Sequence, residues 1–121
     1  LNKIIQKKKL IKNFYKKFLD KKKFNLLSNN KYTDGNYWIN VATIKNVNLK
    51  SFNKYVELLI KKNIEARYVW YPNHLQKPFK KYQRYKVNNI CNLVKKSICL
   101  PSSLNLKEKE IIKIFKILNK I

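Results

Sequence analysis

The chain has 121 residues, of which 45% are apolar, and this length is enough for one domain with one modest core. Its 29 lysine and arginine residues outweigh six acidic ones, and the net charge of +23 favours anionic partners such as nucleic acid. Lysines interrupt every apolar run before it reaches the roughly 18 residues of a membrane span, and they also exclude a signal peptide at the N-terminus. The one glycine, Gly35, excludes a glycine-rich phosphate loop.

The basic residues are almost all lysine, because Arg67 and Arg84 are the only arginines. Asparagine and isoleucine are also abundant, and these three amino acids together are typical of an AT-rich genome. Proteins that read nucleic acid tend to use arginine, whose planar fork contacts phosphate and guanine with two hydrogen bonds. We therefore interpret the charge mainly as compositional, with non-specific polyanion binding as its expected consequence.

The two cysteines, Cys91 and Cys99, are eight residues apart, and His74 is the only histidine. Neither the spacing of the cysteines nor the number of possible cysteine and histidine ligands fits a structural zinc site. We expect two buried thiols in a reducing cytoplasm, and no metal.

The first third of the chain predicts a helix, a turn and a strand. Apolar residues recur every three or four positions over 2–19, with lysines between them, as in an amphipathic helix. Asp34 and Gly35 mark a turn in the polar segment 28–35. Aromatic and β-branched residues dominate 37–44, which predicts a central strand.

The middle of the chain predicts a second helix and a second strand. Asn48 can cap a helix over 49–62, and Asn63 can end it in the left-handed region. The segment 64–70 then predicts a strand that stops before Pro72.

The last third predicts a loop and three short elements. Residues 75–87 form a loop rich in aromatics and lysine, followed by a helix over 88–96 and a strand over 97–100. Asn105 and Glu108 resemble a capping box at the start of the last helix. The expected buried stripe of that helix is Ile111, Ile112, Phe115 and Leu118.

This order of elements predicts an α+β fold with a sheet of about three strands and helices packed on one face. The first helix is longer than so small a domain needs. We therefore expect residues 1–27 to be a connector helix from a further, large domain, and residues 28–121 to form the small domain.

Two residues are the best candidates for a binding site. His74 lies just past the end of a strand, where α/β proteins gather ligands, and an imidazole there could bind a phosphate, a carboxylate or a hydroxyl. The alternative is a surface histidine without a role. Arg67 is an arginine among lysines, which favours a planar contact with an anion. The alternative is an ordinary strand arginine paired with Glu57 or Glu65.

Aromatic and basic residues alternate in and beside the loop. They could stack bases and track phosphates, flank a nucleotide-sugar, or pack over the sheet. The sequence shows no complete set of catalytic residues. The residues concerned are Trp70, Tyr71, Phe79, Tyr82, Tyr85, Lys77, Lys80, Lys81 and Arg84.

Residues 63–79, NIEARYVWYPNHLQKPF, resemble the small-domain segment of the DegT–StrS aminotransferases, whose pattern is roughly G-I-E-x-R followed by P-x-H-x-Q-x-P-[YF]. The segment 98–103 is similar to the family's L-S-L-P strand, and 104–108 to the L-[TS]-x-x-[ED] start of the last helix. Residues 37–41 match the first small-domain strand. Asn63 stands where the family usually has glycine, which a left-handed helix end tolerates.

The resemblance implies the C-terminal small domain of a fold type I enzyme that uses pyridoxal 5'-phosphate (PLP). Such enzymes are dimers with the active site at the subunit interface, and they move an amino group from glutamate to a keto sugar carried on a nucleotide. The finer similarity is to enzymes of the perosamine or legionaminic pathways, which serve surface polysaccharide. The resemblance also implies that the catalytic lysine lies upstream of Leu1 and that this piece alone is inactive.

By the same resemblance, His74 contacts the sugar nucleotide or the amino donor, and Arg67 holds a carboxylate or phosphate. Tyr71 and Asn73 are second choices for substrate binding. Two other functions remain open from the residues alone. One is a small basic RNA- or DNA-binding module, and the other is a protein-interaction domain that docks through its first helix.

Overall fold

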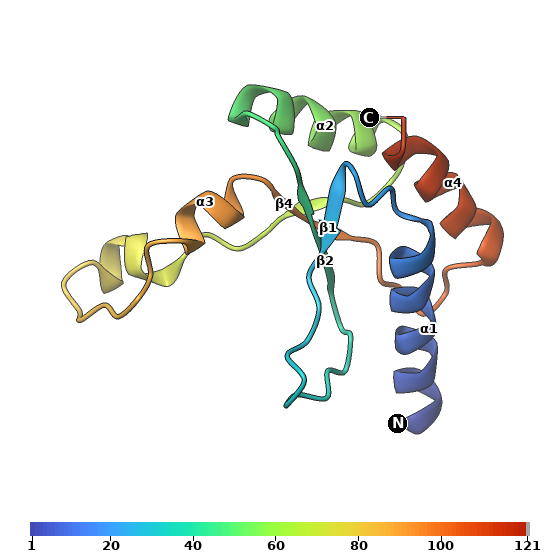
Figure 1. The fold of residues 1–121 in the computed structure, drawn as a ribbon, viewed down its shortest axis with the longest axis horizontal. Helices are drawn as coiled ribbons and strands as arrows, with labels where there is room; N and C mark the ends of the chain where they lie inside the picture. Colours follow the sequence, from blue (N-terminus) through green and yellow to red (C-terminus); the bar gives the residue numbers. More distant parts are fainter. Residues whose placement is uncertain (121) are drawn as a thin grey trace.

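The computed structural model describes residues 1–120 (Figure 1). This part of the chain contains four α-helices and four strands, with two short 3₁₀ turns between β3 and α3. The elements are α1 (Asn2–Phe18), β1 (Phe24–Leu26), β2 (Asn40–Ile44), α2 (Leu49–Lys61), β3 (Arg67–Tyr68), η1 (Asn73–Leu75), η2 (Lys77–Phe79), α3 (Ile90–Val94), β4 (Ser97–Leu100) and α4 (Glu108–Leu118).

The strands form one antiparallel sheet in the order β1-β2-β4-β3. This confirms the α+β class and the central place of β2, but the sheet has four strands where the sequence predicted about three. The additional strand, β1, is only three residues long and follows a run of lysines, so it carries no alternating pattern. It lies within residues 1–27, which therefore contribute to the sheet as well as the first helix; the domain division itself remains a prediction.

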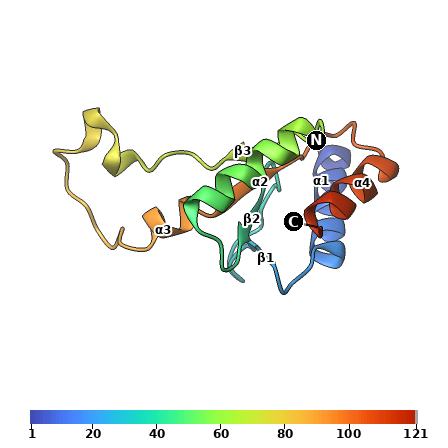
Figure 2. The ribbon, with the colours of Figure 1, turned by 90° about the horizontal axis from the view of Figure 1, so that it is seen from above.

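The core lies on one face of this sheet. Ala42 pairs with Ile98 and Asn40 with Leu100, and directly paired residues point to the same face. Ala42, Ile98 and Leu100 join one buried cluster with residues of α1, α2 and α4, so these three helices cover that face. Figure 2 shows α2 crossing the strands, with α1 and α4 side by side beyond its end.

The opposite face carries Val41, Cys99 and Arg67, which are neighbours because β2 and β3 both pair with β4 at Cys99. None of the three belongs to the main core cluster. The short helix α3 adjoins this face farther along β4, where Ser97 Oγ donates to the carbonyl of Leu93. Arg67 is thus placed on the side of the sheet that the long helices leave free.

The predicted N-cap of α2 and the left-handed conformation of Asn63 are confirmed, although the C-cap itself is Lys62, one residue earlier than predicted. The Asn48 side chain accepts a hydrogen bond from the backbone N–H of Ser51 at 2.8 Å. Asn63 adopts a φ of 57°, in the left-handed region, and its N–H donates to the carbonyl of Ile60.

The last helix differs from the prediction in its start and in one buried residue. It begins at Glu108, where the backbone N–H of Lys107 donates to Glu110 Oε2 at 2.7 Å, so Asn105 does not cap it. Ile114 is buried, whereas Ile112 is 42% exposed. Ile114 continues the spacing of three or four residues from Ile111, and Ile112 is rotated away from it by about 100°.

Two strands and one short helix are shorter than predicted, and the helix is α3, which spans Ile90–Val94 where 88–96 was expected. β2 starts at Asn40, because Tyr37 has a φ of 53° that a strand cannot contain. β3 has two residues because it is an edge strand beside the four-residue β4. The expectation of two buried thiols holds for Cys99, while Cys91 is half-buried.

Residues 70–89 leave the sheet and form what we call the arm. In Figures 1 and 2 the arm extends away from α1 and α4 and returns through α3 to β4. It contains η1 and η2, and most of its side chains are exposed.

Candidate functional site

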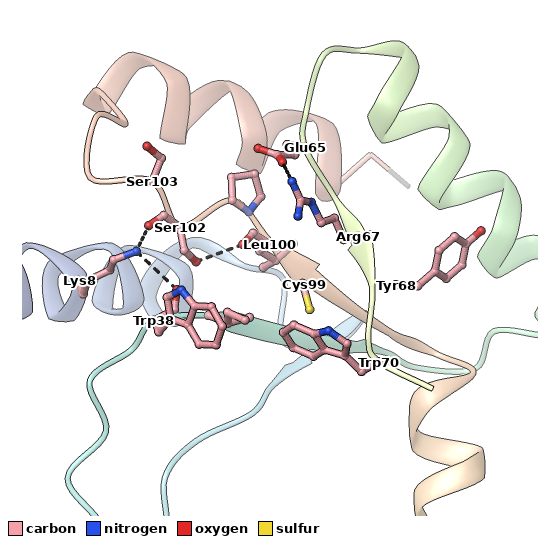
Figure 3. A pocket seen from close by; sticks show the side chains of 12 residues that line it. Lys8, Trp38, Glu65, Arg67, Tyr68, Trp70, Cys99, Leu100, Ser102 and Ser103 are labelled. Atoms are coloured by element: carbon pink, nitrogen blue, oxygen red, sulfur yellow. Dashed lines mark hydrogen bonds and ion pairs between the residues drawn. The ribbon is translucent and has the colours of Figure 1, made fainter. Parts of the chain in front are cut away.

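A pocket of about 400 Å³ opens on the face of the sheet opposite the core (Figure 3). Arg67 of β3 and Cys99 of β4 line it from the sheet. Lys8 reaches it from α1, and Ser102 and Ser103 come from the segment that follows β4. Trp38 and Ile39, which precede β2, line it as well, so four segments far apart in the sequence meet at this pocket.

Two tryptophans form the aromatic part of the pocket. Trp38 precedes β2 and Trp70 follows β3, the two strands on either side of β4, and both side chains line the pocket. Their ring centroids are 6.3 Å apart with an angle of 34° between the planes. The two residues remain 66% and 64% exposed, although their indole rings are large and apolar.

The cations of the pocket come from Lys8 and Arg67. Lys8 Nζ donates to the carbonyls of Trp38 and Ser102, which holds the middle of α1 against the rim. Arg67 pairs with Glu65, which is one of the two partners considered for an ordinary strand arginine. Both side chains of this pair are largely exposed, and such surface pairs contribute little stability, so the guanidinium is available to an anionic ligand.

Cys99 lies at the floor of the pocket and is buried. Burial raises the pKa of its thiol, and the nearby Arg67 lowers that pKa by a smaller amount. Because the net direction is upward, the neutral thiol dominates near neutral pH, and Cys99 is a poor nucleophile.

His74 does not line the pocket that contains Arg67. It lies in η1 at the root of the arm, half-buried, with Nε2 at 3.8 Å from the sulfur of Cys91 in α3. The structure therefore does not bring the two first-choice residues together in a single pocket.

Tyr71 and Asn73 also lie in the arm, where they close a turn. The Gln76 side chain donates to the Tyr71 carbonyl at 2.9 Å and to Asn73 Oδ1 at 3.1 Å. The Tyr71 ring itself is exposed. Gln76 does not stand out in the sequence as a site residue, although it is part of the P-x-H-x-Q string; in the structure it holds the turn that carries His74.

Lys8, Trp38, Ser102 and Ser103 do not stand out in the sequence as site residues either. Trp38 fits the pattern of an ordinary strand, and Lys8 fits the solvated face of an amphipathic helix. The four residues meet through the pairing of β2 with β4 and the packing of α1 beside them, which no local pattern reveals.

Residues 1–120 show neither a metal cluster nor a membrane helix. In this range no three His, Cys, Asp or Glu side chains gather closely enough to hold a metal ion. None of the helices described here has the length and apolarity that a membrane crossing requires.

Comparisons with known proteins agree with this architecture. The profile of the DegT/DnrJ/EryC1/StrS aminotransferase family matches residues 1–119. EpsN of Bacillus subtilis (strain 168), which bears a provisional name as a pyridoxal phosphate-dependent aminotransferase, is 37% identical over 79 residues, in a match that covers 62% of this chain and 20% of EpsN.

Solved structures of similar proteins show the same fold. Spr1654 from Streptococcus pneumoniae, provisionally a sugar aminotransferase, superposes in its PMP form with a TM-score of 0.84 at 17% identity, over 98% of this chain and 31% of Spr1654. Helicobacter pylori PseC, an aminotransferase involved in the biosynthesis of pseudoaminic acid, gives a TM-score of 0.80 at 17% identity, over 96% of this chain and 32% of PseC.

The chain thus spans between a fifth and a third of the length of these relatives. Because the family profile covers nearly all of it, the chain belongs to the DegT/DnrJ/EryC1/StrS aminotransferase family.

Proposed function

We propose that the chain is the C-terminal small domain of a PLP-dependent enzyme that moves an amino group from glutamate to a nucleotide-linked keto sugar. The observation that carries this proposal is the match of the family profile to residues 1–119, with α1 to α4 all included. The near-complete superposition on Spr1654, which is described in PLP and PMP forms, supports it at the level of the fold.

The cofactor would be bound mainly outside this chain. A PLP site needs a lysine for the Schiff base and a charged partner for the pyridine nitrogen. In the pocket described above, Lys8 Nζ is hydrogen-bonded to two carbonyls, and the carboxylate of Glu65 is paired with Arg67. This pocket therefore does not fit a complete PLP site, and in this proposal the chain alone is inactive.

The contribution of this chain would be to hold the substrates. Arg67 would bind a carboxylate or phosphate, because its guanidinium offers two parallel donors to such groups. His74, held by the Gln76 turn, would contact the sugar nucleotide or the amino donor. Tyr71 and Asn73 flank it and would bind more weakly, since the Asn73 side-chain oxygen is already used in that turn.

The biological setting is part of the same proposal. PseC is named for the biosynthesis of pseudoaminic acid, an amino sugar, which supports a role in making amino sugars for surface polysaccharide. The intact enzyme would be a cytoplasmic homodimer, as the family resemblance implies. The family match disfavours the nucleic-acid module and the interaction domain as primary functions.

The test is a transamination assay on the complete reading frame that contains these 121 codons. With PLP, glutamate and a nucleotide-linked keto sugar, we expect formation of 2-oxoglutarate that depends on the sugar. Replacement of His74 by alanine should lower kcat/KM by about tenfold, the scale of one charged hydrogen bond.

Arg67→Gln should weaken binding of the anionic substrate by a similar factor. Arg84→Gln is the matched control, because Arg84 is an exposed arginine of the arm whose side chain donates only to the Lys80 carbonyl. Absence of any transamination by the complete protein would reject the proposed function, whereas unchanged kinetics of His74→Ala would reject only that residue's role.

A further inference from the structure

The two tryptophans of the chain stand together at the surface. They are its only tryptophans, they come from opposite ends of different strands, and each keeps about two thirds of its surface exposed. Proteins usually bury such rings, and an exposed aromatic pair in a pocket is typical of a binding site. The structure of residues 1–120 thus leaves an aromatic surface free at the place where the pocket opens.

The geometry of the pair favours a sugar ring over a flat base. Two rings that sandwich a nucleobase must be parallel, with a gap between them that the base fills. The rings of Trp38 and Trp70 are instead tilted by 34°, and their centroids are 6.3 Å apart. In Figure 3 the two rings lie side by side, so their exposed faces can act as one bent surface. The faces of aromatic rings are electron-rich, and the C–H groups on one side of a pyranose carry the complementary partial charge.

The surroundings of the pair are rich in hydrogen-bond donors. In Figure 3, Lys8 and Arg67 lie on opposite sides of the pocket, with the two indole rings between and below them. Ser103 adds a hydroxyl group on the Lys8 side, whereas the Ser102 hydroxyl already donates to the Leu100 carbonyl. A ligand that matches this arrangement has an apolar ring face, hydroxyl groups at its edge and at least one anionic group.

We infer that Trp38 and Trp70 form the platform for the hexose ring of a glycosyl phosphate, with Arg67 and Lys8 taking its phosphate oxygens. This inference rests on the proposed function and deepens it, because it assigns the sugar moiety of the nucleotide-linked substrate to this pocket and two tryptophans to its recognition. The arm, with His74, is then left for other parts of the substrates.

The tryptophans themselves provide the measurement. The chain has a core of its own beneath α1, α2 and α4, so the 121-residue protein can be studied directly after circular dichroism has shown that it is folded. Its indole fluorescence and its two indole N–H resonances report on this pocket alone. Glucose 1-phosphate, inorganic phosphate, glucose and UMP serve as probes, each titrated at constant ionic strength.

Glucose 1-phosphate should shift both indole resonances with one saturable curve and at concentrations about tenfold lower than inorganic phosphate or glucose alone. Trp38→Ala and Trp70→Ala should each weaken this binding by about tenfold, which corresponds to the loss of one stacking contact. Neither substitution should unfold the protein, because both rings are mostly exposed.

Arg67→Gln should weaken the binding, and Arg84→Gln should leave it unchanged. Equal effects of these two variants, or equal binding of inorganic phosphate, would show only general attraction to a highly charged protein and would overturn the inference. Tighter binding of UMP would assign the pocket to the nucleotide and overturn it as well, as would the absence of any shift.

Failure of the inference and failure of the proposed function are separable. A complete enzyme that transaminates normally, with an unchanged KM for the sugar nucleotide in both tryptophan variants, would reject the platform alone. Glucose 1-phosphate binding in a protein that has no transaminase activity would retain the platform and reject the proposed function.

Discussion

Tyr15 joins the first helix to the segment that follows β4. It is fully buried, its hydroxyl donates to the carbonyl of Pro101 at 2.9 Å, and the edge of its ring packs on Phe115. Burial raises the pKa of this phenol well above its usual value of 10.0. The residue therefore fixes α1 beside the pocket rim and makes the stability of the fold sensitive to alkaline pH.

Removing the hydroxyl with Tyr15→Phe should lower the free energy of unfolding by about 1 kcal/mol at neutral pH, because the Pro101 carbonyl loses its donor in a buried place. Urea titrations of both proteins measure this difference. Equal stability would mean that water replaces the lost hydrogen bond.

The same variant should change the response to alkaline pH. Since the folded pKa is raised, the stabilisation is complete below about pH 10 and is lost as pH rises further, when the unfolded chain ionises and the folded chain does not. Wild-type stability should therefore decline above about pH 10 more steeply than that of Tyr15→Phe. Both proteins share the same lysines, so the titration of lysines cancels in the comparison. Parallel curves of unfolding free energy against pH would contradict the raised pKa of Tyr15.

The two cysteines should react at different rates. Cys99 is buried and burial raises its pKa, whereas Cys91 is half-buried near His74. Under native conditions near neutral pH, iodoacetamide should label Cys91 first and Cys99 at least about tenfold more slowly. Peptide mass spectrometry over a time course measures both sites in one sample, and labelling in urea, where the rates should converge, is the control.

At the scale of single elements, the sequence predicted helix positions well and strand lengths poorly. Residues 2–19 and 49–62 are within a residue or two of α1 and α2, because a helix of this length shows a repeated apolar spacing and recognisable caps. Strands of two to four residues are too short to show an alternation, so β1 was missed and β3 was predicted too long. Their extent is set by pairing with the neighbouring strands β2 and β4.

The end of α2 offers a matched pair of substitutions. Asn63 holds a φ of 57°, which glycine adopts without steric strain and alanine adopts at about 1 kcal/mol. Asn63→Gly, the residue usual in the family, should be neutral or slightly stabilising, and Asn63→Ala should destabilise by about 1 kcal/mol. Thermal melts of the two variants measure this difference. Equal destabilisation by both substitutions would show that Asn63 stabilises the helix end through its side chain and not through its backbone conformation.

The last helix offers another pair, because its buried face was predicted with one residue wrong. Ile114 is 4% exposed and Ile112 is 42% exposed. Ile114→Ala should cost about 2–5 kcal/mol of unfolding free energy through lost burial and a cavity, and Ile112→Ala less than about 1 kcal/mol. Each variant is the other's control, since both remove the same atoms from the same helix. A larger loss of stability in Ile112→Ala than in Ile114→Ala would support the buried stripe that was predicted from the sequence.

At the scale of the whole molecule, the class and the order of elements could be predicted from the sequence, but the pocket could not. Arg67 and His74 stood out because their residue types are rare in this chain, and Arg67 does line the pocket. Trp38 and Ser102 reach it through the pairing of β2 with β4, and Lys8 reaches it through the packing of α1, and no local pattern contains either arrangement. The pairing of distant strands is thus what a prediction from local patterns lacks.

The charge of the whole molecule leads to the last prediction. The chain carries +23, while residues 1–120 show only two ion pairs, Lys9–Asp34 and Arg67–Glu65. Folding brings these like charges together, so their mutual repulsion should oppose the compact state. Screening by salt weakens that repulsion, because the Debye length falls from about 30 Å at 0.01 M to about 8 Å at 0.15 M.

The melting temperature of the 121-residue protein should therefore rise between about 10 and 150 mM NaCl, by about 5 °C if screening contributes roughly 1 kcal/mol. Potassium chloride should act equally at the same ionic strength, which separates screening from binding of a particular ion. The same charge should retain the protein on heparin at low salt and release it steeply as salt rises, without preference among nucleic-acid sequences. A melting temperature that is independent of salt would show that the lysines lie far enough apart for water alone to screen their repulsion. A marked preference for particular nucleic-acid sequences would instead support nucleic-acid recognition as a function of the arm.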